Sequence, residues 1–134
     1  MEIIQCKMRD LLFCTNAFVV LRGEKLNVRA AMDVRRIGRA MQPKLDDFNE
    51  VRDELVKKYQ KVDDEGNPIE NDKMIPLSDP DAFQAEFDEL LDADVDLGVR
   101  PLLLSRLDTV KLTTEDVEAL MFMIKDDVDE PIPN

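Results

Sequence analysis

The chain has 134 residues, with 18 lysines and arginines against 30 aspartates and glutamates, no histidine, and a net charge of −12. This length is typical of one domain, and a hydrophobic content of 44% is enough to form a core. No apolar run reaches the roughly 18 residues of a transmembrane helix, and we expect no secretory signal because a basic leader and a cleavage site are missing. Without histidine, the chain lacks the side chain most used for acid–base catalysis near neutral pH and for zinc binding.

The residues needed for nucleophilic or nucleotide chemistry are scarce. Cys6 and Cys14 could form a disulfide, but their apolar surroundings favour two buried, reduced thiols. Two cysteines cannot complete a tetrahedral zinc site without histidine. Ser78 and Ser105 are the only serines, and no imidazole is present to activate either one. None of the four glycines begins a phosphate-binding G-x-x-x-x-G-K loop. We therefore expect a protein with no catalytic residues and no cofactor, rather than an enzyme.

The acidic residues could hide a metal site, so their spacing matters. Residues 92–96 place aspartates at alternate positions, as at the start of a calcium-binding loop. Leu97 replaces the glycine of such a loop, and Leu103 replaces its bidentate glutamate. The alternation instead predicts a strand, with Val95 and Leu97 on one face and the aspartates in water. No aspartate or glutamate stands two residues before a lysine, a spacing common in metal-dependent nucleases, and we expect no metal site.

The N-terminal third predicts a short strand over residues 2–7, followed by a helix over 9–22. Apolar residues at 11, 14, 18 and 21 have helical spacing, and Gly23 is placed for a left-handed C-terminal cap. This helix is apolar nearly all round, since Val19 and Val20 add to the stripe. We therefore expect it to be buried or to meet a partner.

A long amphipathic helix is predicted next, over residues 28–61, with Asn27 as its N-cap. Pro43 should kink this helix rather than break it, because the apolar stripe keeps its phase across the proline. Gly38 either weakens the same region or allows a close helix crossing. At 1.5 Å per residue the helix would be roughly 50 Å long, and a stripe of this length suggests self-association. The stripe consists of Val34, Ile37, Met41, Leu45, Phe48, Val51, Leu55 and Tyr59.

The second half predicts shorter elements. A polar turn is expected over 63–71, an edge strand over 74–77, and a helix over 80–91 that Ser78, Asp79 and Pro80 begin. Segments 95–97 and 102–104 read as extended, and Thr113 caps a last helix that ends at Ile124. Residues 126–134 form an acidic tail that we expect to be disordered. The sequence thus predicts one helix-dominated α+β domain over 1–125, with one long, kinked amphipathic helix and a small sheet of short strands.

Several stretches resemble an uncharacterised family of short proteins encoded by tailed bacteriophages and prophages. They are Met8-Arg-Asp-Leu-Leu after the first strand, Arg52-Asp-Glu-Leu-Val-Lys-Lys-Tyr59 followed by Asp64-Glu-Gly-Asn67, Phe83-Gln-Ala-Glu-Phe-Asp-Glu-Leu-Leu91 leading into Val95-Asp-Leu, and Leu112-Thr-Thr-Glu-Asp-Val-Glu-Ala-Leu120. Together these stretches cover most of the chain. The resemblance implies a viral origin and a small non-enzymatic protein, and it supplies no catalytic residues.

The charge is unevenly distributed along the chain. Residues 1–61 carry a balance of +4, residues 62–96 carry −12 and residues 97–134 carry −4. The basic excess and the acidic segment give two sets of candidate interaction residues. The basic set is Arg29, Arg35, Arg36, Arg39 and Lys44, of which Arg29, Arg36 and Arg39 are expected near one another; the acidic set is Asp88, Glu89, Asp92, Asp94 and Asp96.

Three interpretations of this polarity remain open. Both segments could be solvated surface that packs together, they could guide association with a protein or with a second copy, or the acidic segment could imitate a nucleic acid. Direct nucleic-acid binding is disfavoured by the net charge of −12 and by the lack of tryptophan, and no membrane partner is expected. The leading hypothesis is a non-enzymatic bacteriophage protein of the host cytoplasm or the virion. It would bind another protein, either in virion assembly or by interacting with a host factor. The alternative is an acidic nucleic-acid mimic that inhibits a host defence protein or another DNA- or RNA-binding protein.

Overall fold

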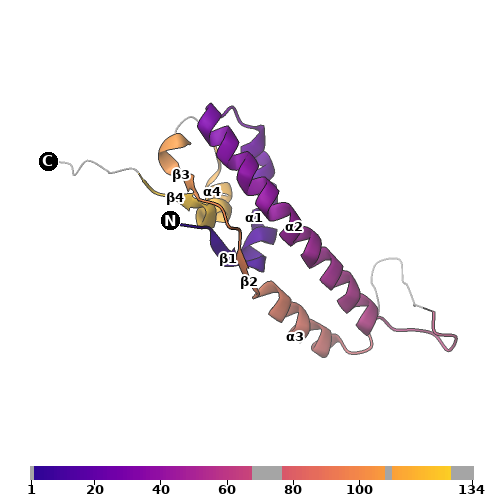
Figure 1. Cartoon of the computed structure of the whole chain (residues 1–134). Coiled ribbons are helices and arrows are strands. Elements are labelled where there is room, and N and C mark those ends of the chain that lie inside the picture. Colours follow the sequence, from indigo (N-terminus) through magenta and orange to yellow (C-terminus); the bar gives the residue numbers. More distant parts are fainter. Residues whose placement is uncertain (1, 68–76, 108–109, 128–134) are drawn as a thin grey trace.

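The computed structural model describes residues 2–67, 77–107 and 110–127, which form a helix-dominated α+β domain (Figure 1). Helices α1 and α2 are joined by a short loop and pack against each other, and α4 packs against α1. The elements in chain order are β1 (Gln5–Lys7), α1 (Met8–Gly23), α2 (Val28–Tyr59), α3 (Pro80–Leu91), β2 (Asp94–Asp96), β3 (Leu102–Leu103), the 3₁₀ helix η1 (Leu104–Arg106), α4 (Thr114–Leu120), the 3₁₀ helix η2 (Met121–Met123) and β4 (Ile124–Lys125).

At the start of helix α1, the Lys7 backbone N–H donates to Asp10 Oδ2 at 2.9 Å, so a first-turn carboxylate satisfies the N-cap donor. The prediction that Gly23 forms a left-handed cap is wrong. Gly23 is the last residue of α1 and lacks a positive φ, whereas Glu24 is extended and its N–H donates to the Leu21 carbonyl. Because the chain continues as an extended loop into Asn27, the helix ends without a left-handed residue. The buried face of α1 consists of Met8, Leu11, Cys14, Ala17, Phe18 and Leu21.

Helix α2 is continuous from Val28 to Tyr59, and Pro43 lies inside it without breaking it. Its N-cap is Asn27, whose side-chain oxygen accepts from the Ala30 N–H at 2.8 Å, as predicted. Most of the apolar stripe is covered within the chain by α1, α3 and β3, whereas Val51 is 44% exposed. Self-association stays a prediction. The buried residues of α2 are Ala30, Val34, Ile37, Met41, Phe48 and Leu55.

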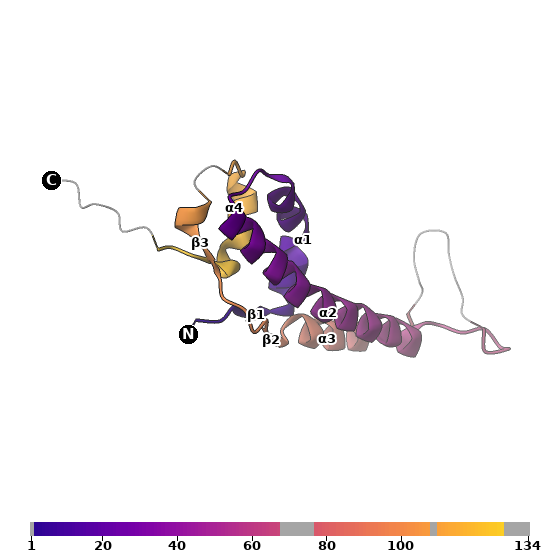
Figure 2. The same cartoon turned by 45° about the horizontal axis from the view of Figure 1, so that its top comes forward.

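Helix α3 lies along the C-terminal half of α2 (Figure 2). Asp79 caps it by accepting from the Ala82 N–H, and Pro80 occupies its first turn, as predicted. Aromatic rings then join the two helices. Phe87 meets Phe48 edge-on with ring centroids 6.1 Å apart, and Phe83 stacks on Phe87 at 5.8 Å. Such pairs add to the free energy of burial because of their ring geometry.

The strands form two separate two-stranded sheets. β1 pairs antiparallel with β2, so that Cys6 lies opposite Val95, and β3 pairs in parallel with β4. The last helix is shorter than predicted: α4 ends at Leu120, a 3₁₀ turn follows, and Ile124 joins the sheet opposite Leu102. This pairing satisfies backbone groups that a longer helix would have left at its end.

Some predicted segments lie partly outside the described residues. Of the edge strand expected at 74–77, only Leu77 is described, and it forms an isolated bridge with Gln60. The turn after α2 is present at its start, where Asp63 Oδ1 accepts from the Glu65 N–H, and Gly66 has a φ of +83°. Of the predicted acidic tail, residues 128–134 lie outside the described part.

The buried faces of α1 and α2 should contribute strongly to stability. Leu11 and Ile37 are fully buried, one on each helix. Replacing either with alanine should lower the free energy of unfolding by about 2–5 kcal/mol, because the change removes apolar burial and leaves a cavity. Urea denaturation monitored by circular dichroism measures this loss. Phe13 of α1 is 70% exposed, so Phe13→Ala is the matched control. A loss for Phe13→Ala as large as for Leu11→Ala would contradict the assignment of the two faces of α1.

Candidate protein-interaction surfaces

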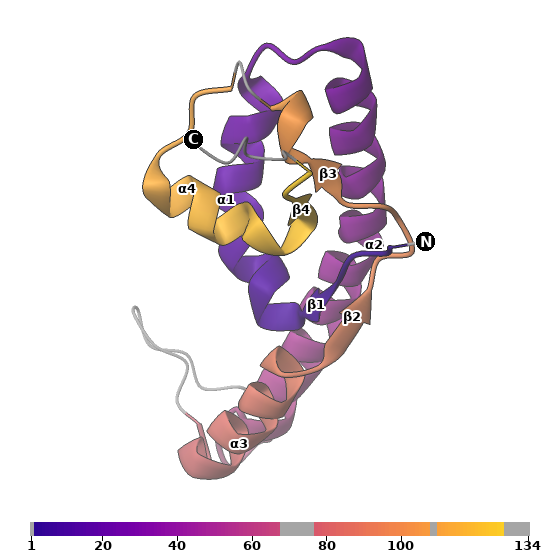
Figure 3. The same cartoon turned by 90° about the vertical axis from the view of Figure 1, so that its left-hand side faces the viewer.

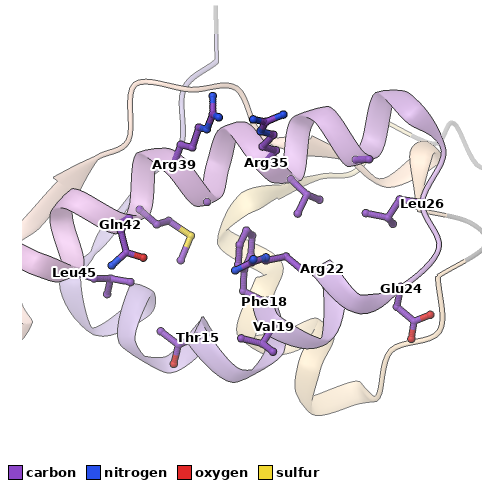
Figure 4. Close-up of a pocket in the computed structure, with 14 residues that line it drawn as sticks. Thr15, Phe18, Val19, Arg22, Glu24, Leu26, Arg35, Arg39, Gln42 and Leu45 are labelled. Atoms are coloured by element: carbon purple, nitrogen blue, oxygen red, sulfur yellow. The ribbon is translucent and has the colours of Figure 1, made fainter.

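A groove of about 640 Å³ lies between α1 and the N-terminal half of α2 (Figure 4). Both helices contribute to it because the loop between them turns the chain back on itself. Gly38 lets Phe18 lie against α2, since a Cβ at position 38 would stand only 3.2 Å from Phe18 Cε1. Gly38 therefore serves a close crossing, one of the two roles predicted for it. The apolar lining of this α1–α2 groove consists of Phe18, Val19, Leu26, Ala31, Val34, Met41 and Leu45.

Three arginines line the same groove: Arg22 from α1, and Arg35 and Arg39 from α2. Figure 4 shows Arg22 reaching into the space between the helices, with Arg35 and Arg39 rising from α2 on the side away from α1. All three are exposed, and no carboxylate in the described ranges 2–67, 77–107 and 110–127 pairs with any of them. The groove thus combines an apolar lining with three uncompensated positive charges.

The other polar groups of the groove are few. Thr15 and Gln42 contribute neutral side chains, and the Thr15 hydroxyl is already used because it donates to the Leu12 carbonyl at 3.0 Å. Glu24 is the one acidic residue of the lining, at the end nearest the loop into α2. The groove therefore offers a net positive charge to whatever covers it.

The predicted basic set is divided by the fold. Arg35 and Arg39 line the α1–α2 groove, whereas Arg29, Arg36 and Lys44 do not. Arg36 instead pairs with Asp33 at 3.1 Å, so the expected grouping of Arg29, Arg36 and Arg39 is not a shared site. Helical spacing explains the division. Residues 29 and 36 lie seven positions apart on one flank of α2, and residues 35 and 39 lie four apart on another.

The sequence did not predict an ion pair whose carboxylate is largely buried. Asp33, whose side chain is only 15% exposed, also accepts from Arg106 Nη1 at 2.8 Å and so links α2 to η1. Asn27 reinforces this link, because its side-chain N–H donates to the Arg106 carbonyl. Two arginines sharing one carboxylate indicate a structural role for Asp33.

The acidic set does not lie against the basic set. Asp94 pairs with Lys7 at 2.6 Å, and Asp92 pairs with Arg9, so both partners come from the N-terminal segment rather than from α2. Asp96 accepts from the Gly98 N–H. The remaining two are exposed: Asp88 accepts from Gln84 at 2.9 Å, and Glu89 stands on the exposed side of α3. No local pattern predicts Lys7 and Arg9 as partners, because the antiparallel pairing of β1 with β2 brings them to Asp94 and Asp92.

Helix α1 is buried on one face only. The residues Phe13, Val19 and Val20 are 70%, 64% and 42% exposed. The helix predicted to be either buried or in contact with a partner therefore has one buried face and one exposed apolar face. Figure 3 shows α1 beside α2 with α4 crossing it, and α1 also contacts β1 and α3. Val19 also lines the α1–α2 groove.

The two thiols are not arranged for nucleophilic chemistry. Both cysteines are free, and Cys14 Sγ donates to the Leu11 carbonyl at 3.2 Å. Burial raises the pKa of Cys14 to about 12 and that of Cys6 to about 11. Both groups are therefore neutral thiols at physiological pH, which is the unreactive form. In the described part of the chain, no three histidine, cysteine or acidic side chains are placed to hold a metal ion together.

The chain matches no protein-family model, no curated protein and no solved structure. The resemblance to phage proteins therefore stays a prediction. No helix among the described residues is both long enough and apolar enough to cross a membrane.

The raised thiol pKa values predict how stability depends on pH. Between about pH 9 and pH 12, the unfolded chain loses thiol protons that the folded chain retains, so the free energy of unfolding should fall. Urea midpoints across this range measure the effect. The Cys6→Ala/Cys14→Ala variant titrates the same lysines and tyrosine, so its decline should be shallower than that of the wild type. Parallel declines would show that the thiols are not the cause.

Proposed function

We propose that this chain is a non-enzymatic protein that acts by binding another protein through the α1–α2 groove. The observation that carries the proposal is the combination of an apolar lining with three arginines, Arg22, Arg35 and Arg39, that have no carboxylate partner among the described residues. Apolar concavities with a few polar groups are typical binding sites, and arginine is enriched where proteins meet. Val19, which is 64% exposed, contributes an accessible part of this apolar lining on α1.

The setting we propose is bacteriophage infection, because the sequence resembles short phage and prophage proteins. The partner would then be a phage structural protein or a host protein, and the location would be the host cytoplasm or the virion. Neutral thiols and the shortage of serine support a binding role over catalysis.

The alternative of an acidic nucleic-acid mimic has weaker support. A mimic needs a row of uncompensated negative charges, and Asp92 and Asp94 are paired with Arg9 and Lys7. The exposed ion pairs stabilise the fold little, but they lower the local charge of the row. Neutralising the acidic set therefore tests this alternative.

Val19→Asp should test the groove without disturbing the core, because Val19 is 64% exposed. Asn16→Asp, on an exposed position of α1, makes the same charge change away from the groove lining. Quantitative affinity capture from infected-cell extracts should show a stoichiometric protein with the wild type and with Asn16→Asp. Val19→Asp should reduce its recovery about ten-fold or more. Equal recovery with both variants, or no stoichiometric protein at all, would contradict the proposal.

The acidic set separates the two candidate functions. The variant D88N/E89Q/D92N/D94N/D96N neutralises the five carboxylates of the acidic set, which lie at the end of α3, directly after it and on β2. Under the proposed function, partner recovery should stay within about two-fold of the wild type, because none of these residues lines the α1–α2 groove. If recovery is abolished and the captured protein is a nucleic-acid-binding protein, the mimic is the correct function and the groove is not the site.

A further inference from the structure

We infer that the partner presents an acidic amphipathic helix to the α1–α2 groove; this inference rests on the proposed function and names its ligand. The described residues offer apolar contacts along the middle of the groove and guanidinium groups around it. A ligand that satisfies both must be apolar on one face and negatively charged on a flank.

The walls of the groove favour a helix over an extended peptide. Both walls are helices whose backbone N–H and C=O groups are bonded internally, so they offer no sheet edge to an extended strand. An extended segment would leave its own backbone groups unsatisfied against the apolar lining, whereas a helix satisfies them itself. The lining on α2 runs from Ala31 to Leu45, which at 1.5 Å per residue is about 21 Å, or about four helical turns.

The spacing of the arginines specifies the charged flank. Arg35 and Arg39 stand four residues apart on α2, a rise of about 6 Å, and glutamates at i and i+4 of a ligand helix have the same rise. Because both arginines rise from α2 away from α1, they would meet the flank of the ligand that overlies α2. Arg22 reaches in from α1 and would meet a third carboxylate nearer the middle. Guanidinium–carboxylate pairs of this kind combine charge with directional hydrogen bonds.

Glu24 restricts where the negative charge can lie. It is half-buried at the loop end of the groove, where a ligand carboxylate would be repelled. The acidic flank must therefore lie over Arg35 and Arg39 and stop short of Glu24. The chain as a whole carries −12, so long-range fields oppose an acidic ligand and attraction must come from these three arginines at short range.

The test uses two synthetic helical peptides of 16 residues with leucines at i, i+3/i+4 and i+7. One carries a glutamate pair at i and i+4 on the flank, and the other carries glutamines there. Fluorescence anisotropy should give at least ten-fold tighter binding of the glutamate peptide at about 0.05 M salt. This preference should shrink as salt is raised, because screening weakens exposed charge pairs.

Two double variants of the full chain locate the effect. R35E/R39E should lose the preference for glutamate and should instead bind a lysine version of the peptide more tightly than the glutamine version. R29E/K44E makes the same change in net charge on α2 outside the groove, and it should retain at least half of the wild-type affinity. Equal binding of glutamate and glutamine peptides, no binding of either at 1 mM, or equal losses in both double variants would overturn the inference.

Other outcomes remain distinguishable from failure of the proposed function. If Val19→Asp still abolishes partner capture while the peptides are not discriminated, protein binding stands and the acidic helix is wrong. If light scattering shows a dimer that R35E/R39E dissociates and R29E/K44E does not, a second copy occupies the groove, and the inference of a separate partner falls.

Discussion

Burial of the apolar stripe on α2 is the constraint on which the rest of the structure depends. A 32-residue helix with one continuous apolar side must be covered along its length, and three other elements divide that task. Helix α1 covers the N-terminal half, α3 covers the C-terminal half through Phe48, Phe83 and Phe87, and β3 also contacts α2. Apolar burial supplies most of the favourable free energy in such a domain.

The way these elements cover α2 also determines which charged groups become neighbours. Because α3 packs along the C-terminal half of α2, the acidic set lies away from the arginines at residues 29–39. The chain then returns along β2, where pairing with β1 brings Asp94 to Lys7 and Asp92 to Arg9. At the other end of α2, Asp33 forms ion pairs with Arg36 and Arg106. The arginines of the groove form no ion pair with a described carboxylate.

The features fixed by local chemistry could be predicted from the sequence. Asn27 and Asp79 cap their helices as predicted, and the 3.6-residue period located α2 across Pro43. Features fixed by distant contacts could not. The end of α4 depends on Ile124 pairing with Leu102, 22 positions away, and the α1–α2 groove depends on how Phe18 packs on Gly38. A basic stretch on a helix predicts exposed charge, but only the position of α1 decides which of its arginines share a site with Arg22.

The two ends of the molecule therefore differ in more than the sign of their charge. At the acidic end, Lys7 and Arg9 already compensate two carboxylates, and such exposed pairs contribute little to stability because water and salt screen them. At the basic end, the charges stand beside an apolar lining, where contact with a partner would exclude water and strengthen every ion pair formed. A net charge of −12 describes the field far from the protein. Within the Debye length of roughly 8–10 Å, the local arrangement determines which partner fits, and around the groove that arrangement is positive and apolar.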